Sequence, residues 1–330
     1  MPTAAASPDE REPRRIQLYR PHNQLGDLLL NVPAIRAVRE RFPRAHLTLL
    51  VGRQNAAAVE GQAWADRVRI VDTRNFLGVL RTAFAAGPRP DLAIYFTTVS
   101  YSRSGAFLVA RSGARTRIGF DPVRWGERDR ARLTRVVPYP EGPRHQSEVS
   151  LALARASGAE RVPGPPYFVP DPALVARAPE GAVYLHPGAG KLKNRWGASG
   201  FAAVARELIA QGADVRLLEG PQDTGTVAAV HAALGRELPV VRGETIPMLA
   251  ARFARAALYV GNDTGPLHLA GATGCPTVGI YGWTDPAEWS PVGARVRCVR
   301  AADRSLDSVP PRYVLDAALP LMEEARCPRA

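Results

Sequence analysis

The sequence is poor in the residues that make disulfides, membrane spans and secretory leaders. It has three cysteines in 330 residues, and Cys275, Cys298 and Cys327 form an odd, widely spaced set that argues against both a disulfide framework and a zinc site. No apolar run approaches the roughly 20 residues of a membrane-spanning helix. Residues 1–15 lack the apolar core of a signal peptide, so we expect a disordered lead there. These absences indicate a globular protein of the reducing cytosol.

Two common nucleotide-binding motifs are missing as well. No G-x-G-x-x-G follows the first predicted strand, which disfavours a nicotinamide-dependent dehydrogenase. The glycine-rich turn HPGAGKLKNRW, residues 186–196, lacks the G-x-x-x-x-G-K-[ST] spacing of a P-loop. The sequence therefore matches neither class.

Lysine is almost absent, whereas arginine is abundant. Lys191 and Lys193 are the only lysines, and both lie in that glycine-rich turn. The preference for arginine is typical of GC-rich coding. The two clustered lysines are either a chance, solvated pair or a source of compact positive charge for a ligand.

The chain is strongly basic, with 43 basic and 31 acidic residues and a formal charge of +12. Such a charge indicates anionic partners, namely nucleic acid, an anionic membrane surface or phosphorylated substrates. Nucleic acid would explain the charge but not the turns described below. Nine arginines between residues 103 and 135 form either a solvated face or a basic rim for an anionic acceptor: Arg103, Arg111, Arg115, Arg117, Arg124, Arg128, Arg130, Arg132 and Arg135.

The first half of the chain predicts a parallel sheet. Residues 15–19 and 45–51 are predicted strands, and the helical run 28–42 joins them, which requires a parallel pair. Two further buried strands are predicted at 67–72 and 91–96.

After a proline-rich, aperiodic stretch at 158–180, predicted to be an interdomain linker, strands alternate with helices. This alternation is typical of a doubly wound α/β domain. We place the first domain at 16–165, the second at 166–309, and in 310–330 a helix that packs across the cleft onto the first domain. The predicted strands of the second domain are 182–186, 213–220, 238–243, 257–262 and 276–282, and its helices are 199–212, 224–235, 246–256 and 265–274.

In doubly wound sheets, ligands bind at the carboxyl ends of the strands. The first strand of the second domain leads into the lysine-bearing turn. There Gly188 and Gly190 allow close approach of the backbone to a ligand, and Lys191 and Lys193 supply charge. Ser199 is the expected N-cap of the next helix. The combination suits a diphosphate.

A later strand leads into NDTGPLHLAGATG, residues 262–274. Asp263 and Thr264 are good capping residues, so the segment predicts a well-capped helix. The same arrangement makes an anion site from the backbone N–H groups of Thr264 and Gly265. His268, about one helical turn further, is either a structural residue or a phosphate contact.

Three acids lie at predicted turns. Glu219 and Asp223 end the strand at 213–220, where a carboxylate often binds a ribose diol, although Asp223 is equally suited to capping the next helix. Asp27 follows Gly26 at the start of a helix, where the helix dipole favours an acid. If the turn before it faces the cleft, Asp27 is also placed to take a proton from an incoming hydroxyl.

In their order along the chain, these motifs resemble glycosyltransferase family 9, the lipopolysaccharide heptosyltransferases. LGDLLLNVPAIRAVRERFPRAHLTLLVG (25–52) resembles the opening of that family. The lysine-bearing turn with FAAVARELIAQGADVRLLEGPQD (201–223) is similar to the start of its donor domain, and NDTGPLHLAGATGCPTVGIYGWTDPAEWSPVG (262–293) resembles its most specific signature. The matches run from about residue 16 to 295.

This resemblance implies a GT-B architecture, an α/β arrangement of two Rossmann-like domains whose parallel sheets face a central cleft. It also implies that a sugar, typically L-glycero-D-manno-heptose, moves with inversion from an ADP donor to a glycan such as the lipopolysaccharide core. A cytoplasmic enzyme that visits the inner membrane leaflet and binds no nucleic acid would fit these substrates.

The resemblance further assigns roles to individual residues. Asp27 matches the proposed general base, and Lys193 matches a lysine that contacts the donor diphosphate, with Lys191 as its competitor. The remaining donor-binding candidates are Glu219, Asp223, Glu244, Asp263, Thr264, Gly265 and His268, where Asp223 matches a ribose ligand and Glu244 an adenine contact. The expected acceptor-binding residues are Arg20, Asn23 and Arg117.

No D-x-D motif, with which many glycosyltransferases hold a divalent metal, occurs in the chain. We therefore expect no metal and no cofactor, and expect lysine and a helix N-terminus to balance the departing diphosphate. Two alternatives stay open. One is a nucleotide-sugar epimerase or hydrolase of the same architecture. The other is a non-catalytic protein that binds nucleotide sugars or anionic glycolipids, against which the intact Asp27 counts.

Overall fold

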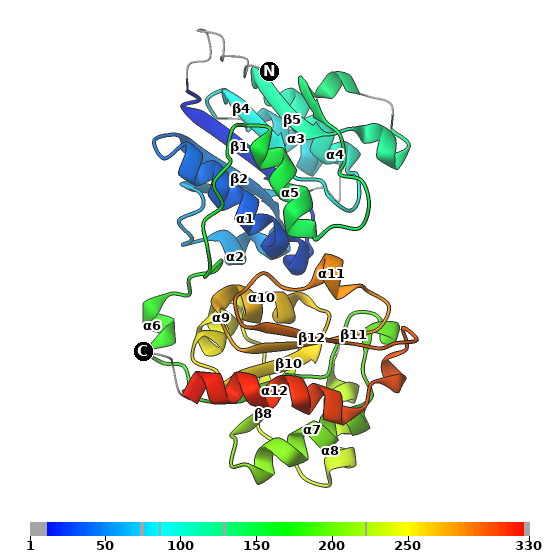
Figure 1. Ribbon diagram of the computed structural model, residues 1–330. Coiled ribbons are helices and arrows are strands. Elements are labelled where there is room, and N and C mark those ends of the chain that lie inside the picture. Colours follow the sequence, from blue (N-terminus) through cyan, green and yellow to red (C-terminus); the bar gives the residue numbers. More distant parts are fainter. Residues whose placement is uncertain (1–11, 73–75, 86, 128–129, 222, 327–330) are drawn as a thin grey trace, which may run out of the picture.

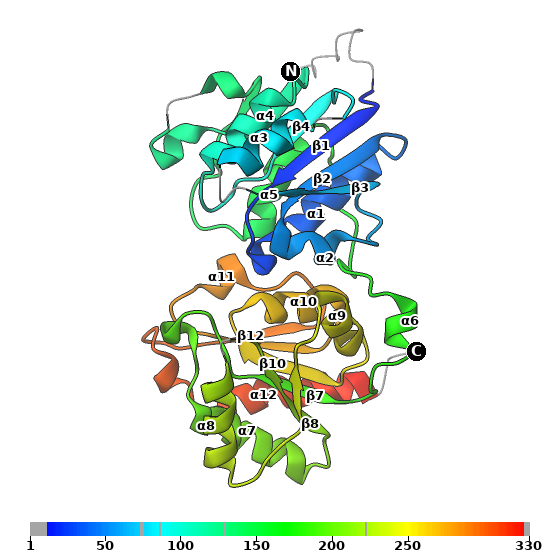
Figure 2. The same cartoon turned by 180° about the vertical axis from the view of Figure 1, so that it is seen from behind.

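The computed structural model describes residues 12–72, 76–85, 87–127, 130–221 and 223–326 (Figure 1). Of the lead expected at 1–15, residues 1–11 lie outside this part of the chain, and Arg15 already belongs to the first strand. The chain folds into two α/β domains, one above the other in Figure 1, and Figure 2 shows the same arrangement from behind.

Each domain contains a parallel six-stranded sheet, ordered β3-β2-β1-β4-β5-β6 in the first and β12-β11-β10-β7-β8-β9 in the second. The predicted pair of doubly wound sheets is thereby confirmed. The first sheet comprises β1 (Arg15–Arg20), β2 (His46–Gly52), β3 (Arg67–Val71), β4 (Leu92–Tyr95), β5 (Thr116–Phe120) and β6 (Arg135–Val137). The second comprises β7 (Val183–His186), β8 (Val215–Glu219), β9 (Val240–Arg242), β10 (Leu258–Asn262), β11 (Thr277–Tyr281) and β12 (Val296–Arg300).

The central strands are almost continuously apolar because helices cover both faces of each sheet. In the first sheet Leu18 of β1 lies in register with Leu49 of β2 and Ile94 of β4, and all three side chains are fully buried. The helices of the first domain are α1 (Leu25–Arg41), α2 (Ala56–Val59), α3 (Phe76–Phe84), α4 (Arg103–Arg111) and α5 (Gln146–Arg155). Those that follow are α6 (Pro172–Val175), α7 (Ala198–Ala210), α8 (Thr224–Leu234), α9 (Ile246–Ala254), α10 (Gly265–Thr273), α11 (Pro286–Trp289) and α12 (Pro311–Arg326).

Helix α1 has apolar residues on nearly all of its faces, as expected for a helix that is enclosed by other elements. Its buried positions run from Leu28 to Val38, and it packs against α5 of its own domain and α10 of the second. The helix continues through Pro33, which would break an exposed helix interior. We attribute its tolerance here to packing from both sides.

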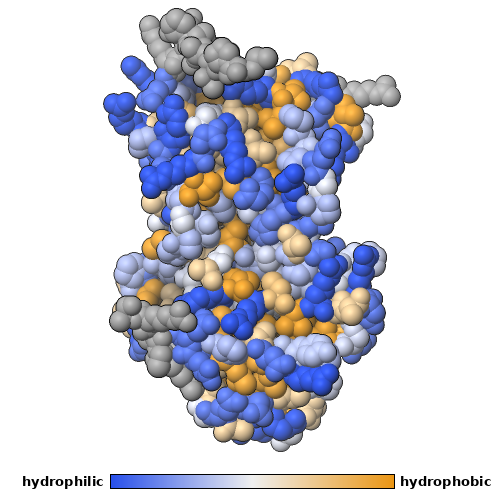
Figure 3. Space-filling view, viewed as in Figure 1, coloured by the Kyte–Doolittle hydropathy of each residue, from blue (hydrophilic) through white to orange (hydrophobic). Residues whose placement is uncertain are grey.

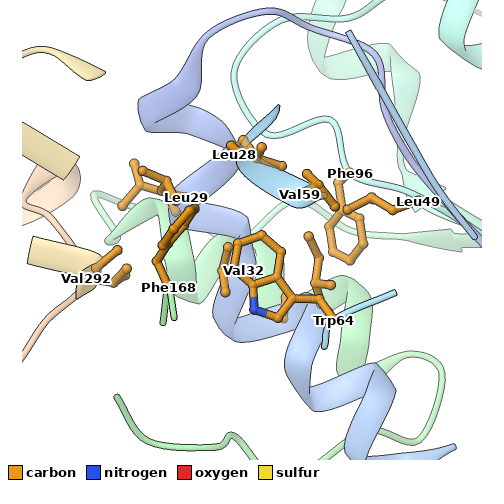
Figure 4. Close-up of a cluster of buried hydrophobic side chains, with 14 of the residues drawn as sticks. Leu28, Leu29, Val32, Leu49, Val59, Trp64, Phe96, Phe168 and Val292 are labelled. Carbon is orange, nitrogen blue, oxygen red and sulfur yellow. The ribbon is translucent and has the colours of Figure 1, made fainter. Parts of the chain in front are cut away.

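One hydrophobic cluster joins the two domains through α1 and α10. Leu29 and Val32 of α1 share this cluster with Phe168, which follows α5, and with Val292, which follows α11 (Figure 4). An interdomain hydrogen bond lies beside it, between His145 Nε2 and the Ser290 carbonyl oxygen (2.8 Å). The two sheets are therefore held at a shared apolar core and not only by the chain between them.

The chain crosses from the first domain to the second between α5 and β7 and passes through the short α6 (green in Figure 1). The linker expected at 158–180 falls within this connection. Sequence patterning did not predict the strands β5, β6 and β12 or the helices α2 to α6 and α11. It also placed the N-cap of α7 at Ser199, whereas the structure has Gly197 there.

The terminal helix does not pack as expected. Helix α12 lies against α7, β10, β11 and β12 of the second domain (red in Figure 1), so its predicted packing across the cleft is wrong for the described residues. The reason is its apolar stripe, because Val314, Ala318 and Leu321 complete the core of the second sheet. On the face drawn in Figure 3, hydrophilic side chains cover much of both domains and apolar ones lie scattered between them.

Candidate functional site

The predicted donor-binding residues gather at the carboxyl edge of the second sheet. In that sheet β10 lies between β7 and β11, and β8 lies beyond β7. The turns that follow β7 and β10 carry the two glycine-bearing motifs, so they are neighbours in space although about 75 residues separate them.

A buried asparagine ties these two turns together. Asn262, at the end of β10, donates from Nδ2 to the carbonyl oxygens of Pro187 (2.9 Å) and Gly188 (3.2 Å). Its Oδ1 accepts a hydrogen bond from the backbone N–H of Trp196 (3.0 Å). Since Asn262 is fully buried, its amide fixes the start and the end of the lysine-bearing turn. Sequence reasoning missed this residue; a polar residue ending a buried strand was the available signal.

A buried histidine–aspartate pair lies under the same turn. His186 Nε2 and Asp223 Oδ2 are 3.0 Å apart, and the Gly220 N–H donates to the same carboxylate oxygen (2.9 Å). The hydrogen bond from His186 holds the pKa of Asp223 below its ordinary value. His186 Nδ1 lies 3.3 Å from the hydroxyl oxygens of Tyr259 and Thr264. His186 thus connects the turn after β8 to the turn after β10, a role that the sequence did not reveal.

This pair changes the interpretation of Asp223. Its side chain is 8% exposed, and a Cβ placed on Gly188 would lie 2.0 Å from its carboxyl carbon. The carboxylate is therefore covered by the turn that it supports. Asp223 thus supports the lysine-bearing turn. The ribose contact expected for it from the resemblance stays a prediction.

The second turn leads directly into a helix N-terminus. Thr264 is the N-cap of α10 and Gly265 its first residue, as predicted. The Thr264 hydroxyl donates to the Asn262 carbonyl oxygen (3.2 Å) rather than capping the helix amides. Asp263 accepts a hydrogen bond from the Thr284 hydroxyl (2.7 Å), and its other oxygen lies 3.4 Å from His268 Nε2. Asp263 is thus part of the frame around the N-terminus of α10.

The two lysines differ in their surroundings. Lys191 is exposed at the start of a short 3-10 turn, Leu192–Asn194. Lys193 is also exposed, but its Nζ lies 4.7 Å from the centroid of the Trp283 ring. Arg195 supports the turn from within, because its Nε donates to the Ala189 carbonyl oxygen (2.8 Å).

Glu219 and Glu244 lie at the side of this edge formed by β8 and β9. Glu219 ends β8 and pairs with Arg242 (3.0 Å), whereas Glu244 follows β9 and pairs with Arg252 (2.6 Å). Both carboxylates are held by arginines of their own domain.

Asp27 lies in the first turn of α1, on the first domain. The Arg20 Nη2 donates to Asp27 Oδ2 (2.9 Å), and the side chains are 3% and 22% exposed respectively. Burial lowers the pKa of Arg20, while burial and the Arg20 charge lower the pKa of His22 to about 4, so His22 is neutral near pH 7. Arg20 therefore orients Asp27 from below, and Asp27 presents the more accessible atoms.

The other expected acceptor residues lie in different places. Asn23, in the turn before α1, accepts a hydrogen bond from the Gln54 N–H (3.3 Å) and is partly exposed near Asp27. Arg117 lies at the amino-terminal end of β5 and donates to the carbonyl oxygens of Ala114 and Arg132 (2.8 Å each). It is at the opposite edge of the sheet from Asp27, so the structure does not bring it to the cleft.

The two halves of the site are in direct contact through α1 and α10. The imidazole of His268, in the first turns of α10, lies against Gly26 of α1, the residue before Asp27. A Cβ on Gly26 would lie 2.7 Å from His268 Cδ2. His268 is 5% exposed, so this geometry favours a structural role for it at the domain junction.

Two further findings concern what the described chain offers to ligands and membranes. Among the described residues, no group of three or more His, Cys, Asp or Glu side chains is arranged to hold a metal ion. None of the helices in this part of the chain has the length and apolar character that a bilayer crossing requires.

Comparison with known proteins places these features in context. The model of glycosyltransferase family 9 (heptosyltransferase) matches residues 102–309. Lipopolysaccharide heptosyltransferase 3 of Escherichia coli is 24% identical over 289 residues, which cover 81% of this chain and 83% of that protein. The matched family range contains the donor-side residues, whereas Asp27 precedes it.

Solved structures show the same fold. A family 9 glycosyltransferase from Veillonella parvula superimposes with a TM-score of 0.84 at 20% identity, covering 94% of this chain and 97% of that chain. The heptosyltransferase WaaC of Escherichia coli, solved with ADP, gives a TM-score of 0.79 at 18% identity and covers 93% and 99% respectively.

Proposed function

Because this chain belongs to glycosyltransferase family 9, the heptosyltransferases, we propose that it transfers a heptose-type sugar from an ADP-sugar to an anionic glycan acceptor. The transfer is a single displacement with inversion and needs no divalent metal. The observation that supports this proposal best is the packing of Gly26 against His268, because it sets Asp27 beside the turn where α10 begins.

The diphosphate of the donor binds where α10 starts. Backbone N–H groups at Thr264 and Gly265 carry the partial positive charge of a helix N-terminus, and the Thr264 hydroxyl is directed to other partners. The solved ADP complex of WaaC, a protein of the same fold, fits an ADP donor. Lys193, on the neighbouring turn, adds a full charge as the glycosidic bond breaks and the nucleotide gains negative charge.

Asp27 acts as the general base on the acceptor hydroxyl. Its carboxylate is oriented by Arg20 and remains partly exposed, so an acceptor can reach it. The proton passes from the acceptor hydroxyl to Asp27 while the acceptor oxygen attacks the anomeric carbon and ADP leaves from the opposite face. General base catalysis of this kind contributes roughly 10²- to 10⁴-fold in rate.

Metal independence follows from the charges that the chain itself supplies. The sequence has no D-x-D motif, whereas Lys193 and the N-terminus of α10 supply positive charge on neighbouring turns of the second sheet. Fixed cations and dipoles in a site that excludes water stabilise developing charge without reorganisation.

The acceptor is a glycan of the lipopolysaccharide core type, by analogy with the relative from Escherichia coli. The formal charge of +12 favours such an anionic partner and brief visits to an anionic membrane surface. Sedimentation with vesicles tests the second point. Binding to anionic but not to neutral vesicles, weakened by salt, is expected, and equal binding to both would contradict it.

One experiment separates this function from its alternatives. The purified protein is incubated with an ADP-heptose in EDTA, with and without a heptose-deficient lipopolysaccharide acceptor. ADP and product are measured by mass spectrometry, the configurations of donor and product by NMR, and donor binding by calorimetry. Acceptor-dependent ADP release with a heavier, inverted product is expected. ADP release without acceptor would indicate a hydrolase. An isomerised donor would indicate an epimerase, and donor binding without any turnover would indicate a binding protein.

A further inference from the structure

Trp283 is an exposed aromatic residue at the edge where the donor is proposed to bind. It follows β11, and 58% of its surface is accessible to solvent. Lys193 Nζ lies 4.7 Å and Arg304 Cζ lies 5.9 Å from the centroid of its ring. Both distances are within the range of about 6 Å in which a cation is attracted to an aromatic face. Neither Trp283 nor Arg304 was among the residues predicted from sequence.

The contact between Lys193 and Trp283 spans the end of a strand. Lys193 belongs to the turn after β7, Trp283 follows β11, and β10 lies between those two strands. The contact between the ammonium group and the indole therefore joins the segments on either side of β10 at its carboxyl end. That end of β10 leads through Asp263 and Thr264 into Gly265, the first residue of α10.

The segment that carries Trp283 is firmly held. The next residue, Thr284, donates to Asp263 (2.7 Å), and Asp285 caps α11 and pairs with Arg300. On the other side, a Cβ at Gly282 would lie 2.9 Å from the Arg304 carbonyl oxygen, so the backbone packs closely there. Arg304 itself has a φ of +65°, a backbone conformation that residues other than glycine rarely adopt. The backbone on either side of Trp283 is thus closely packed.

The tip of the lysine-bearing turn, in contrast to the segment around Trp283, is exposed to solvent. Leu192, between the two lysines, is 79% exposed, and both lysines are exposed beside it. A lysine side chain on such a tip has many rotamers, and a ligand that binds it must restrict them. An indole that is carried on a closely packed backbone segment and attracts the ammonium group restricts them beforehand.

We propose that Trp283 is a positioning residue that holds Lys193 across the end of β10, over the turn that binds the donor diphosphate. The proposal rests on the proposed function. It also distinguishes the two lysines, because it assigns the phosphate contact to Lys193, which lies against the indole, and not to Lys191. Trp283 increases donor affinity by reducing the conformational freedom that Lys193 loses on binding.

Isothermal titration of the full-length protein with ADP, and with adenosine as a ligand without phosphate, tests this role. Trp283→Ala should lower the affinity for ADP about fivefold, which is the effect expected of one partly exposed cation–π contact. The affinity for adenosine should stay unchanged. Trp283→Phe keeps an aromatic face and should stay within about twofold of wild type. Tyr313→Ala is the matched control, since it removes another exposed aromatic ring near an arginine, 5.0 Å from Arg312 Cζ, and should not change ADP affinity.

A double-mutant cycle identifies the partner. Lys193→Met should lower the affinity for ADP. In that background Trp283→Ala should have no further effect on ADP affinity, because both changes remove the same interaction. Additive losses, or an unchanged or stronger ADP affinity in Trp283→Ala, would overturn the positioning role. Failure of the wild-type protein to bind ADP would instead overturn the proposed function and, with it, this inference. A thermal melt of each variant confirms that it is folded.

Discussion

Gly26 of the first domain and His268 of the second are packed so closely that no side chain fits between them. The hypothetical Cβ of Gly26 would lie 2.7 Å from His268 Cδ2, a separation that real Cβ atoms do not show. Asp27 comes next in the chain, and His268 lies on the helix that begins the proposed diphosphate site. The distance between the proposed base and the donor therefore depends on this contact.

Gly26→Ala should separate the two halves of the site. We expect a loss of stability of about 1–3 kcal/mol, typical of overpacking, together with a lower kcat. Gly225→Ala is the control, because a Cβ there meets nothing within 4 Å and Gly225 lies within α8. Urea unfolding and steady-state rates measure both effects. If Gly26→Ala kept wild-type stability and rate, the domain junction would tolerate a Cβ and would not determine the position of Asp27 relative to α10.

Asp27→Asn should abolish most turnover without affecting the donor. The amide cannot accept the proton, so kcat should fall by about 10² or more, whereas ADP affinity should stay within about twofold. Asp307→Asn, the same change at an exposed position, should behave like wild type. Full activity of the Asp27 variant would remove Asp27 from the mechanism.

The buried pair of His186 and Asp223 should make stability depend on pH in the acid range. The pKa of Asp223 is lower in the folded than in the unfolded protein, chiefly because of the His186 hydrogen bond. Its stabilising effect is therefore complete above the unfolded pKa, near 4, and is lost as the pH falls through the lowered folded pKa.

Asp223→Asn tests this dependence directly. Its Tm should lie several degrees below that of wild type at neutral pH, and the difference should shrink once the pH drops below about 4. Asp316→Asn, at an exposed position of α12, should show no such difference at any pH. A constant gap between wild type and Asp223→Asn from neutral to acid pH would contradict the assignment.

Chelation should leave the reaction intact. If Lys193 and the N-terminus of α10 neutralise the leaving diphosphate, initial rates in EDTA should lie within about twofold of those in Mg²⁺. Lys193→Met should be slow under both conditions, with no rescue by Mg²⁺, and Lys191→Met should retain most activity. Rates that fall with EDTA and return with Mg²⁺ would show that the chain's own charges do not suffice.

The sequence by itself determined the strands β1 to β4 and β7 to β11, the helices α1, α7 to α10 and α12, and the turns at the ligand edge of the second sheet. Hydrophobic periodicity depends on neighbours a few residues apart, so residues 257–262 and 265–274 could be assigned as the strand and helix found as β10 and α10. Strong local signals, such as glycine beside lysine and threonine before a helix, placed the lysine-bearing turn and the start of α10 correctly. The order of the strands in each sheet came from the structure.

Only the tertiary structure decided what distant residues do to one another. Asp223 proved to be covered by Gly188 and paired with His186, Arg117 lies at the far edge of its sheet, and α12 completes the second core. Trp283 reaches Lys193 although 90 positions separate them, because β7, β10 and β11 are neighbours in the sheet. No local pattern encodes such contacts, since they arise from how whole elements pack.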